Sequence, residues 1–95
     1  MVLEIAEFDI LAGKENLFAE ATVAAKKVIS QSIGLTSIEF RKCIEKPTRF
    51  IAFIYWETLE DHTIRFRESP LFIEWRAILS PFFNSAPVAM HYNLI

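Results

Sequence analysis

The sequence has little of what several classes of protein require. Its 95 residues include one cysteine, Cys43, and only two glycines, Gly13 and Gly34. A lone cysteine cannot form an internal disulfide, and two isolated glycines cannot build the loop that cradles phosphates in nucleotide-binding folds. No apolar stretch approaches the roughly 20 residues that a membrane-spanning helix needs. We therefore expect neither a Rossmann-type nucleotide cofactor nor a membrane as partner.

Concentrated positive charge is also absent. The formal net charge is -2, and no run of Lys or Arg forms a basic stripe. Nucleic acid is therefore not an expected partner, because binding to phosphates depends on clustered basic side chains. The first ten residues contain acidic and no basic side chains, unlike a secretion signal. With no possible disulfide, this favours a cytoplasmic protein.

Apolar side chains, in contrast, are abundant. Hydrophobic residues make up 53% of the chain, and nine residues are Phe. The length suits one domain over residues 1–95, and a domain this small buries a limited fraction of its surface. The apolar excess must line a ligand cavity or be covered by another subunit. We expect both, namely a homodimer that binds a small apolar or aromatic ligand.

The spacing of apolar residues predicts the element order β-α-β-β-α-α-β. Alternation with a period of two indicates strands, and spacing of three to four residues indicates helices. Gly34 is the expected stop of the first helix, Thr58 to Asp61 resembles a capping box, and Ser69-Pro70 is a typical helix start. The expected elements are a strand over 2–10, a helix over 14–32, strands over 36–45 and 49–56, a helix from 58 to 68, a second helix from Ser69-Pro70 to Pro81, and a strand over 87–95.

This order favours an α+β fold of the ferredoxin-like, split βαβ type. Such a fold has a four-stranded antiparallel sheet with helices on one face. The strand over 49–56, RFIAFIYW, is apolar on both sides and should be covered on both. Ile51, Phe53 and Tyr55 are candidates for the face without helices. A second subunit's sheet would cover that face and form the homodimer.

The second half of the chain carries a recognisable pattern. It comprises WETLEDHT from Trp56, FRESP from Phe66, EWR from Glu74, PFF from Pro81, and HY from His91. The pattern resembles the antibiotic biosynthesis monooxygenase domain, a family of dimeric α/β barrels, and the element order fits over almost the whole chain. The resemblance implies a cavity between sheet and helices in each subunit.

The resemblance also implies a chemistry. In cofactor-independent members, a phenolic or enolic substrate is deprotonated, and the electron-rich anion reduces molecular oxygen directly. Neither flavin nor metal is then needed, because the protein supplies a dry pocket, a base and hydrogen-bond donors. The implied function is a cofactor-independent monooxygenase acting on a small aromatic or quinol-like compound.

His62 and His91 are the candidate catalytic residues. An imidazole with a pKa near 6.5 can accept a proton at neutral pH. His62 falls in the helix expected to roof the cavity, although a solvent-facing histidine is the alternative. His91 should point away from its neighbours Met90 and Tyr92, toward either the cavity or the dimer seam. Two histidines without clustered carboxylates or thiols are a poor metal set, so no metal site is expected.

The candidate substrate contacts are aromatic and basic side chains. Trp residues can stack on a planar substrate or simply fill the core, and Tyr can donate to an oxyanion. Three arginines, Arg65, Arg67 and Arg76, can hold an anionic oxygen or pair with Glu57, Glu68 or Glu74 at the surface. The expected substrate-binding set is Trp56, Arg65, Phe66, Trp75, Phe83 and Tyr92.

One departure from the family pattern keeps the functional class open. Many quinol-type members carry a His three residues before the Ser-Pro pair, and here that position is Phe66. The enzyme hypothesis therefore stands beside two others. The protein can be a binding module that holds a small ligand without turning it over, or a structural dimer with no pocket.

Overall fold

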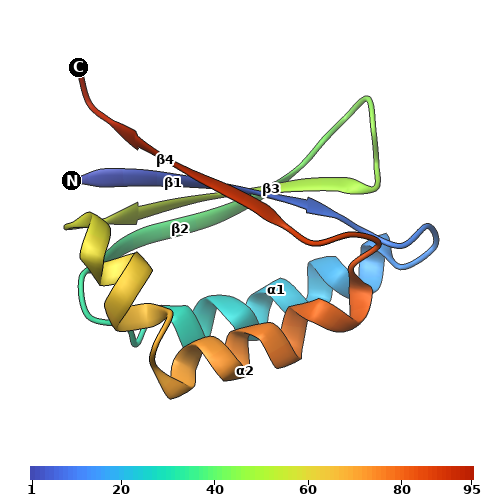
Figure 1. Ribbon diagram of the computed structural model, residues 1–95. Coiled ribbons are helices and arrows are strands. Elements are labelled where there is room, and N and C mark those ends of the chain that lie inside the picture. Colours follow the sequence, from blue (N-terminus) through green and yellow to red (C-terminus); the bar gives the residue numbers. More distant parts are fainter.

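Four antiparallel strands form one sheet, and the helices pack against one of its faces, in the computed structural model of residues 1–95 (Figure 1). The sheet order is β2-β3-β1-β4. The expected α+β, ferredoxin-like fold is thereby confirmed. The elements are β1 (Val2–Asp9), α1 (Glu15–Ile29), β2 (Leu35–Lys42), β3 (Arg49–Trp56), η1 (Asp61–Phe66), α2 (Pro70–Leu79), η2 (Ser80–Phe82) and β4 (Val88–Asn93).

The central strand β3 has the boundaries that its sequence predicts. Its alternate residues Phe50, Ala52, Ile54 and Trp56 are buried beneath the helices. The other side chains of β3 lie on the opposite face of the sheet, as expected. No helix covers that face (Figure 1). The period of two along an extended chain therefore separates a core layer from an open layer.

The core fills the space between the sheet and helices α1 and α2. Phe18 of α1 is fully buried, and its ring lies 4.8 Å from that of Phe50 and 5.6 Å from that of Phe8. Burying one such side chain is worth roughly 1.5–3 kcal/mol. These rings lie where β1 ends and β3 begins. The opposite end of the β1–β3 pairing includes the polar residue Glu4. None of the helices combines the length and the apolar character that crossing a membrane requires.

The helix expected over 58–68 is present but is wound as a π-helix, η1. The backbone N–H of Arg67 donates to the carbonyl of His62, five residues earlier, at 3.1 Å. The capping box forms at its start, since the N–H of Thr58 donates to Asp61 Oδ2 at 3.1 Å and the N–H of Asp61 to Thr58 Oγ1 at 3.2 Å. Such wide turns often occur at functional sites. Here the turn directs His62 and Phe66 into the interior.

One expected helix end and one expected helix cap need correction. Helix α1 ends at Ile29, five residues before Gly34. Gly34 has a φ of +84° and shapes the turn into β2, where its carbonyl accepts the N–H of Glu57 at 2.8 Å. Helix α2 begins at Pro70 as expected, but the Ser69 hydroxyl donates to the carbonyl of Phe66 and does not cap α2.

Candidate functional site

Glu4 and His91 form a cross-strand pair at the polar end of the sheet. The two residues are directly opposite each other in the register of β1 and β4. Glu4 shares a face with the buried residues Ala6 and Phe8, so its side chain points toward the helices and is only 4% exposed. Because directly opposite residues on antiparallel strands lie on the same face, His91 also points that way. A buried carboxylate and an imidazole are thus placed side by side by strand pairing alone.

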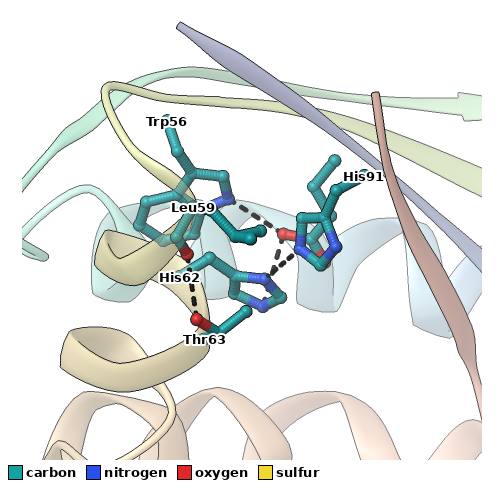
Figure 2. Close-up of polar contacts among 6 residues, drawn as sticks. Trp56, Leu59, His62, Thr63 and His91 are labelled. Carbon is teal, nitrogen blue, oxygen red and sulfur yellow. Dashed lines mark hydrogen bonds and ion pairs between the residues drawn. The ribbon is translucent and has the colours of Figure 1, made fainter. Parts of the chain in front are cut away.

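His62 approaches this pair from η1 on the helical side (Figure 2). Its Nδ1 lies 2.7 Å from Nε2 of His91, and its Nε2 lies 3.4 Å from Oε1 of Glu4. The indole N–H of Trp56 donates to the same Oε1 of Glu4 at 2.9 Å. The stacked rings of Trp56 and His62, 5.2 Å apart, fix the imidazole in place. We call Glu4, His62 and His91 the Glu-His-His cluster.

The two histidines of the cluster share one hydrogen bond that can run in either direction. His62 Nδ1 and His91 Nε2, 2.7 Å apart, can each be the donor or the acceptor, depending on the tautomers. An imidazole suits a proton-transfer role because its two nitrogens exchange donor and acceptor roles. The 3.4 Å approach of His62 Nε2 to Glu4 Oε1 is a charge contact and not a hydrogen bond. The half-buried His91 is thus hydrogen-bonded to the imidazole that lies nearest the buried carboxylate.

Burial sets the protonation of the cluster. Desolvation raises the pKa of Glu4 from 4.5 to about 7, while the Trp56 hydrogen bond and the charge of Arg67 oppose the rise. Desolvation, with contributions from His91 and Arg67, lowers the pKa of His62 from 6.5 to about 4. The pKa of His91 is lowered as well, by burial and by Arg67. Both imidazoles are therefore neutral at pH 7, and Glu4 is the group that titrates there.

A cavity of about 390 Å³ lies between the sheet and the helices beside the cluster. Most of its lining is apolar, and Glu4 and His62 are among the few polar groups that reach it. Both protein contacts of Glu4 use Oε1, which leaves Oε2 without a protein partner. The volume lies in the range of small-molecule sites. A planar, mostly apolar ligand in this cavity can therefore contact one carboxylate oxygen, Oε2 of Glu4.

The structure brings together four of the residues singled out from the sequence. His62, Phe66, Trp75 and Phe83 all line the cavity. The rings of Phe66 and Trp75 meet edge to face with centroids 6.0 Å apart, and they form a continuous aromatic wall. These side chains come from η1, α2 and the segment before β4, which lie far apart in the sequence.

The other four expected site residues lie elsewhere. Trp56 is fully buried behind Glu4, and His91 sits behind His62; neither is part of the cavity wall. Arg65 is exposed on η1 and pairs with Asp61 at 3.6 Å. Tyr92 is 47% exposed on the open face of the sheet, beyond the strands from the cavity. The alternation along β4 that turns His91 inward turns Tyr92 outward.

Sequence reasoning missed Glu4. The signal was present, because Glu4 interrupts the apolar row Val2, Ala6, Phe8 and Ile10 on one face of the first strand. A single carboxylate on a core-facing row is a candidate for a buried, perturbed acid. What the row does not reveal is the pairing with His91, which depends on strand register.

The cluster also changes the reasoning about metals. The expectation of no metal site rested on the absence of carboxylates near the two histidines. The structure corrects that premise, because one donor atom from each of Glu4, His62 and His91 lies within 4.8 Å of the others. Two imidazoles and a carboxylate suit several divalent metals. In this structure His62 Nδ1 and His91 Nε2 share a hydrogen bond, and Glu4 Oε1 lies 3.4 Å from His62 Nε2.

Comparison with known proteins agrees with the fold. The family model described as "Antibiotic biosynthesis monooxygenase" matches residues 1–78. The chain is 37% identical to the uncharacterized protein YczJ of Bacillus subtilis strain 168 over 93 residues, with 98% of each chain covered. This protein belongs to the antibiotic biosynthesis monooxygenase family.

The chain is also similar in fold to solved structures. A Bordetella bronchiseptica protein assigned to the antibiotic biosynthesis monooxygenases superposes with a TM-score of 0.95 at 28% identity, covering 99% of this chain and 96% of that one. SnoaB, a cofactor-independent oxygenase from Streptomyces nogalater, gives 0.84 at 13% identity, with coverage of 99% and 92%. A Streptomyces coelicolor monooxygenase from the gene ActVA-Orf6, in complex with nanaomycin D, gives 0.82 at 19% identity, with coverage of 99% and 87%. The last two likenesses concern the fold.

Proposed function

We propose that this protein is a cofactor-independent monooxygenase that oxidises a small aromatic or quinol-like substrate with molecular oxygen. The observation that carries the proposal is the Glu-His-His cluster, which places a titrating carboxylate beside a mostly apolar cavity. Membership of the family supports the reaction type, and the aromatic wall of Phe66 and Trp75 supports a planar substrate.

Glu4 is the proton acceptor that best matches the task. A general base works best when its pKa lies near the working pH, and the pKa of Glu4 is raised to about 7. His62, with a pKa lowered to about 4, is too weakly basic to keep a proton at pH 7. Its role is to pass the proton from Glu4 to His91 through the 3.4 Å and 2.7 Å contacts.

The chemistry balances without a bound redox group. Deprotonation of a phenolic or enolic O–H by Glu4 leaves an anion whose ring carbon is electron-rich. That carbon gives electrons to molecular oxygen and forms a C–O bond, and the O–O bond then breaks as water leaves. Overall, a ring methylene of the keto tautomer and one molecule of oxygen become a ring carbonyl and one molecule of water. One oxygen atom enters the product, and the other leaves in the water.

The cavity contributes by excluding water. In an apolar site, charge interactions are stronger than in bulk water, and side reactions of the anion with solvent are suppressed. Arg67 lines the cavity near the cluster, and its positive charge acts on Glu4, His62 and His91 alike. The same charge stabilises a substrate anion as it forms.

Oxygen consumption tests the proposal directly. We would screen a panel of dihydroxy-aromatic compounds and compare the wild-type protein with His62→Ala. Thr63→Ala is the matched control, because Thr63 is exposed on the same helix and bonds only to the carbonyl of Leu59. Uptake in the wild type and in Thr63→Ala, with a loss of about 100-fold or more in His62→Ala, supports the proposal. Equal rates in all three proteins contradict it.

A binding module is the second candidate, and Phe66 favours it. Phe66 is buried in the cavity wall at the position where many quinol-type members carry a histidine. A cavity with no turnover would still hold an apolar metabolite. Mass spectrometry of ligand released from the purified protein separates the two candidates. An unmodified metabolite together with no oxygen uptake would favour binding.

We also propose that the open face of the sheet pairs with a second copy of the chain. Its exposed apolar residues include Tyr55 on β3 and Val88, Met90 and Tyr92 on β4, each between 38% and 59% exposed. A face of this kind is costly to leave in water. The central strand would then be covered on both sides, as its sequence suggests.

A further inference from the structure

Two arginines at the cavity have no acidic partner. Arg67, just after η1, and Arg76, in α2, both line the cavity. The ion pairs of the chain are Arg41 with Glu39, His62 with Glu4, and Arg65 with Asp61. The surface pairing with Glu68 or Glu74 that the sequence left open therefore does not form. The cavity wall therefore carries two guanidinium groups that have no partner in an ion pair.

Both guanidinium groups lie against the same aromatic ring. The Cζ atom of Arg67 is 5.6 Å from the centroid of the Phe72 ring, and that of Arg76 is 5.9 Å from it. Phe72 itself lines the cavity. The two cations are thus held within reach of one ring, although each is otherwise exposed to solvent. They mark one end of the cavity.

Aromatic rings lead from Phe72, the ring beside both guanidinium groups, to the Glu-His-His cluster. The ring of Phe72 meets that of Phe66 at 5.5 Å, and the ring of Phe66 meets that of His62 at 6.2 Å. A planar ligand in this cavity would contact Glu4 and His62 as well as Arg67 and Arg76. Arg67 is close enough to the cluster for its charge to act on Glu4, His62 and His91, so an anionic group of the ligand would lie near the reacting ring.

The charge balance of the cavity points to the same ligand class. Its charged lining residues are Glu4, Arg67 and Arg76, and Glu4 is partly protonated near pH 7. The cavity lining therefore carries net positive charge, which Arg67 and Arg76 supply. Guanidinium groups bind planar carboxylates through paired hydrogen bonds, and they do so best when no protein carboxylate competes.

The geometry points to an aromatic carboxylate as the substrate class, with its carboxylate bound by Arg67 and Arg76 and its reacting ring beside Glu4. The placement of the reacting ring beside Glu4 rests on the proposed function. The anion-binding end stands on the two unpaired arginines and is testable without any turnover. Arg67 and Arg76 are substrate-binding residues in this assignment, and Phe72 orients them.

Binding of two matched probes tests the inference. We would measure the affinity of 2-naphthoate and of the neutral 2-naphthamide by calorimetry at low ionic strength, in the wild type, Arg67→Gln, Arg76→Gln and the double variant. Neither probe carries a phenolic group, so the result does not depend on oxidation. Arg41→Gln is the control for lost surface charge, because Arg41 lies on β2 and pairs with Glu39. Circular dichroism and thermal unfolding check that each variant is folded.

We expect the wild type and Arg41→Gln to bind the carboxylate at least tenfold more tightly than the amide. Each single Arg variant should weaken the carboxylate several-fold, and the double variant should bind both probes alike. A double variant with lysine at both positions should keep part of the preference, which guards against misfolding of the glutamine variants. Equal affinities in the wild type, no binding of either probe, or a preference that survives in the double glutamine variant would overturn the inference. Failure of oxygen uptake alone would remove the assignment of the reacting ring and leave the binding of a carboxylate by Arg67 and Arg76 intact.

Discussion

Glu4 and His91 stand directly opposite each other on β1 and β4. His62 closes the group from η1, with its ring beside that of His91 (Figure 2). Strand pairing fixes the first contact, and the wide turn of the π-helix supplies the second. The three side chains come from both ends and the middle of the chain. The cluster therefore exists only in the folded protein, and its properties can be tested both by stability and by activity.

Stability should depend on pH through Glu4. The pKa of Glu4 is about 7 in the folded protein and near 4.5 when exposed, so the folded form keeps a proton that the unfolded form releases. Its contribution is fully present below pH 4.5 and is lost as pH rises through 7. In Glu4→Gln this loss is absent. The stability of the wild type relative to the variant should fall by up to about 3 kcal/mol between about pH 5 and pH 8.

Urea unfolding at the two pH values checks this difference. His62 acts in the opposite direction, because its lowered pKa gives stability that is present above 6.5 and is lost as pH falls toward 4. Comparing wild type with Glu4→Gln at each pH removes much of that shared effect. A stability difference that does not change with pH would show that Glu4 titrates normally.

His91 should be replaceable by a small molecule. It is half-buried and ends the proton path, so His91→Ala leaves space next to His62 that solutes can reach. We expect oxygen uptake to fall about 10- to 100-fold and to recover as imidazole is added, because imidazole can take over the proton. The rescue is measured as the rate against imidazole concentration. A loss that imidazole does not repair would indicate a purely structural role.

Gly34 should be essential for the position of η1. Its φ is +84°, and a Cβ there would overlap the carboxylate of Asp61, which forms the capping box with Thr58. We expect Gly34→Ala to destabilise the fold by about 2–3 kcal/mol. Gly13→Ala is the matched control, because Gly13 has a φ of +87° and open space where a Cβ would lie. Denaturant unfolding should show the larger loss at Gly34, and equal losses would argue against the overlap.

The open sheet face should control association. Met90 is 59% exposed on β4, and Val23 is 57% exposed on α1 at the opposite surface. We expect Met90→Glu to weaken the proposed dimer at least about tenfold, because a buried carboxylate without a partner is costly. Val23→Glu should leave it unchanged. Sedimentation of both variants against the wild type measures this, and a wild type that is monomeric at micromolar concentration would contradict the dimer.

The sequence carries most of the fold but only part of the site. The alternation in 49–56 and the Thr58–Asp61 capping box are local signals, so strand β3 and the start of η1 were predictable. The π-helical winding was not, because the wide turn depends on what packs around it in the folded chain. Gly34 lies in the expected connection between α1 and β2, but α1 ends five residues before it, since a glycine signals positive φ and not the exact residue at which a helix ends.

The Glu-His-His cluster was likewise only partly predictable from the sequence. His62 and His91 were recognisable as candidates because an imidazole can accept a proton at neutral pH and because both fall on elements expected to border the cavity. The contact between the two histidines, and the presence of Glu4 beside them, depend on the pairing of β1 with β4 and on tertiary packing. No short sequence pattern encodes either of these. Arg65 and Arg67 are equally plausible in sequence, and only the helical winding decides which of the two lines the cavity.

The pH profile of oxygen uptake by wild-type protein and Glu4→Gln tests the central claim most directly. If Glu4 accepts the substrate proton, the wild-type rate should rise with pH through a midpoint of about 7. The glutamine variant should lose about 10²- to 10⁴-fold in rate and show no such rise. A Glu4→Gln variant that keeps the wild-type rate and the same midpoint would contradict the account.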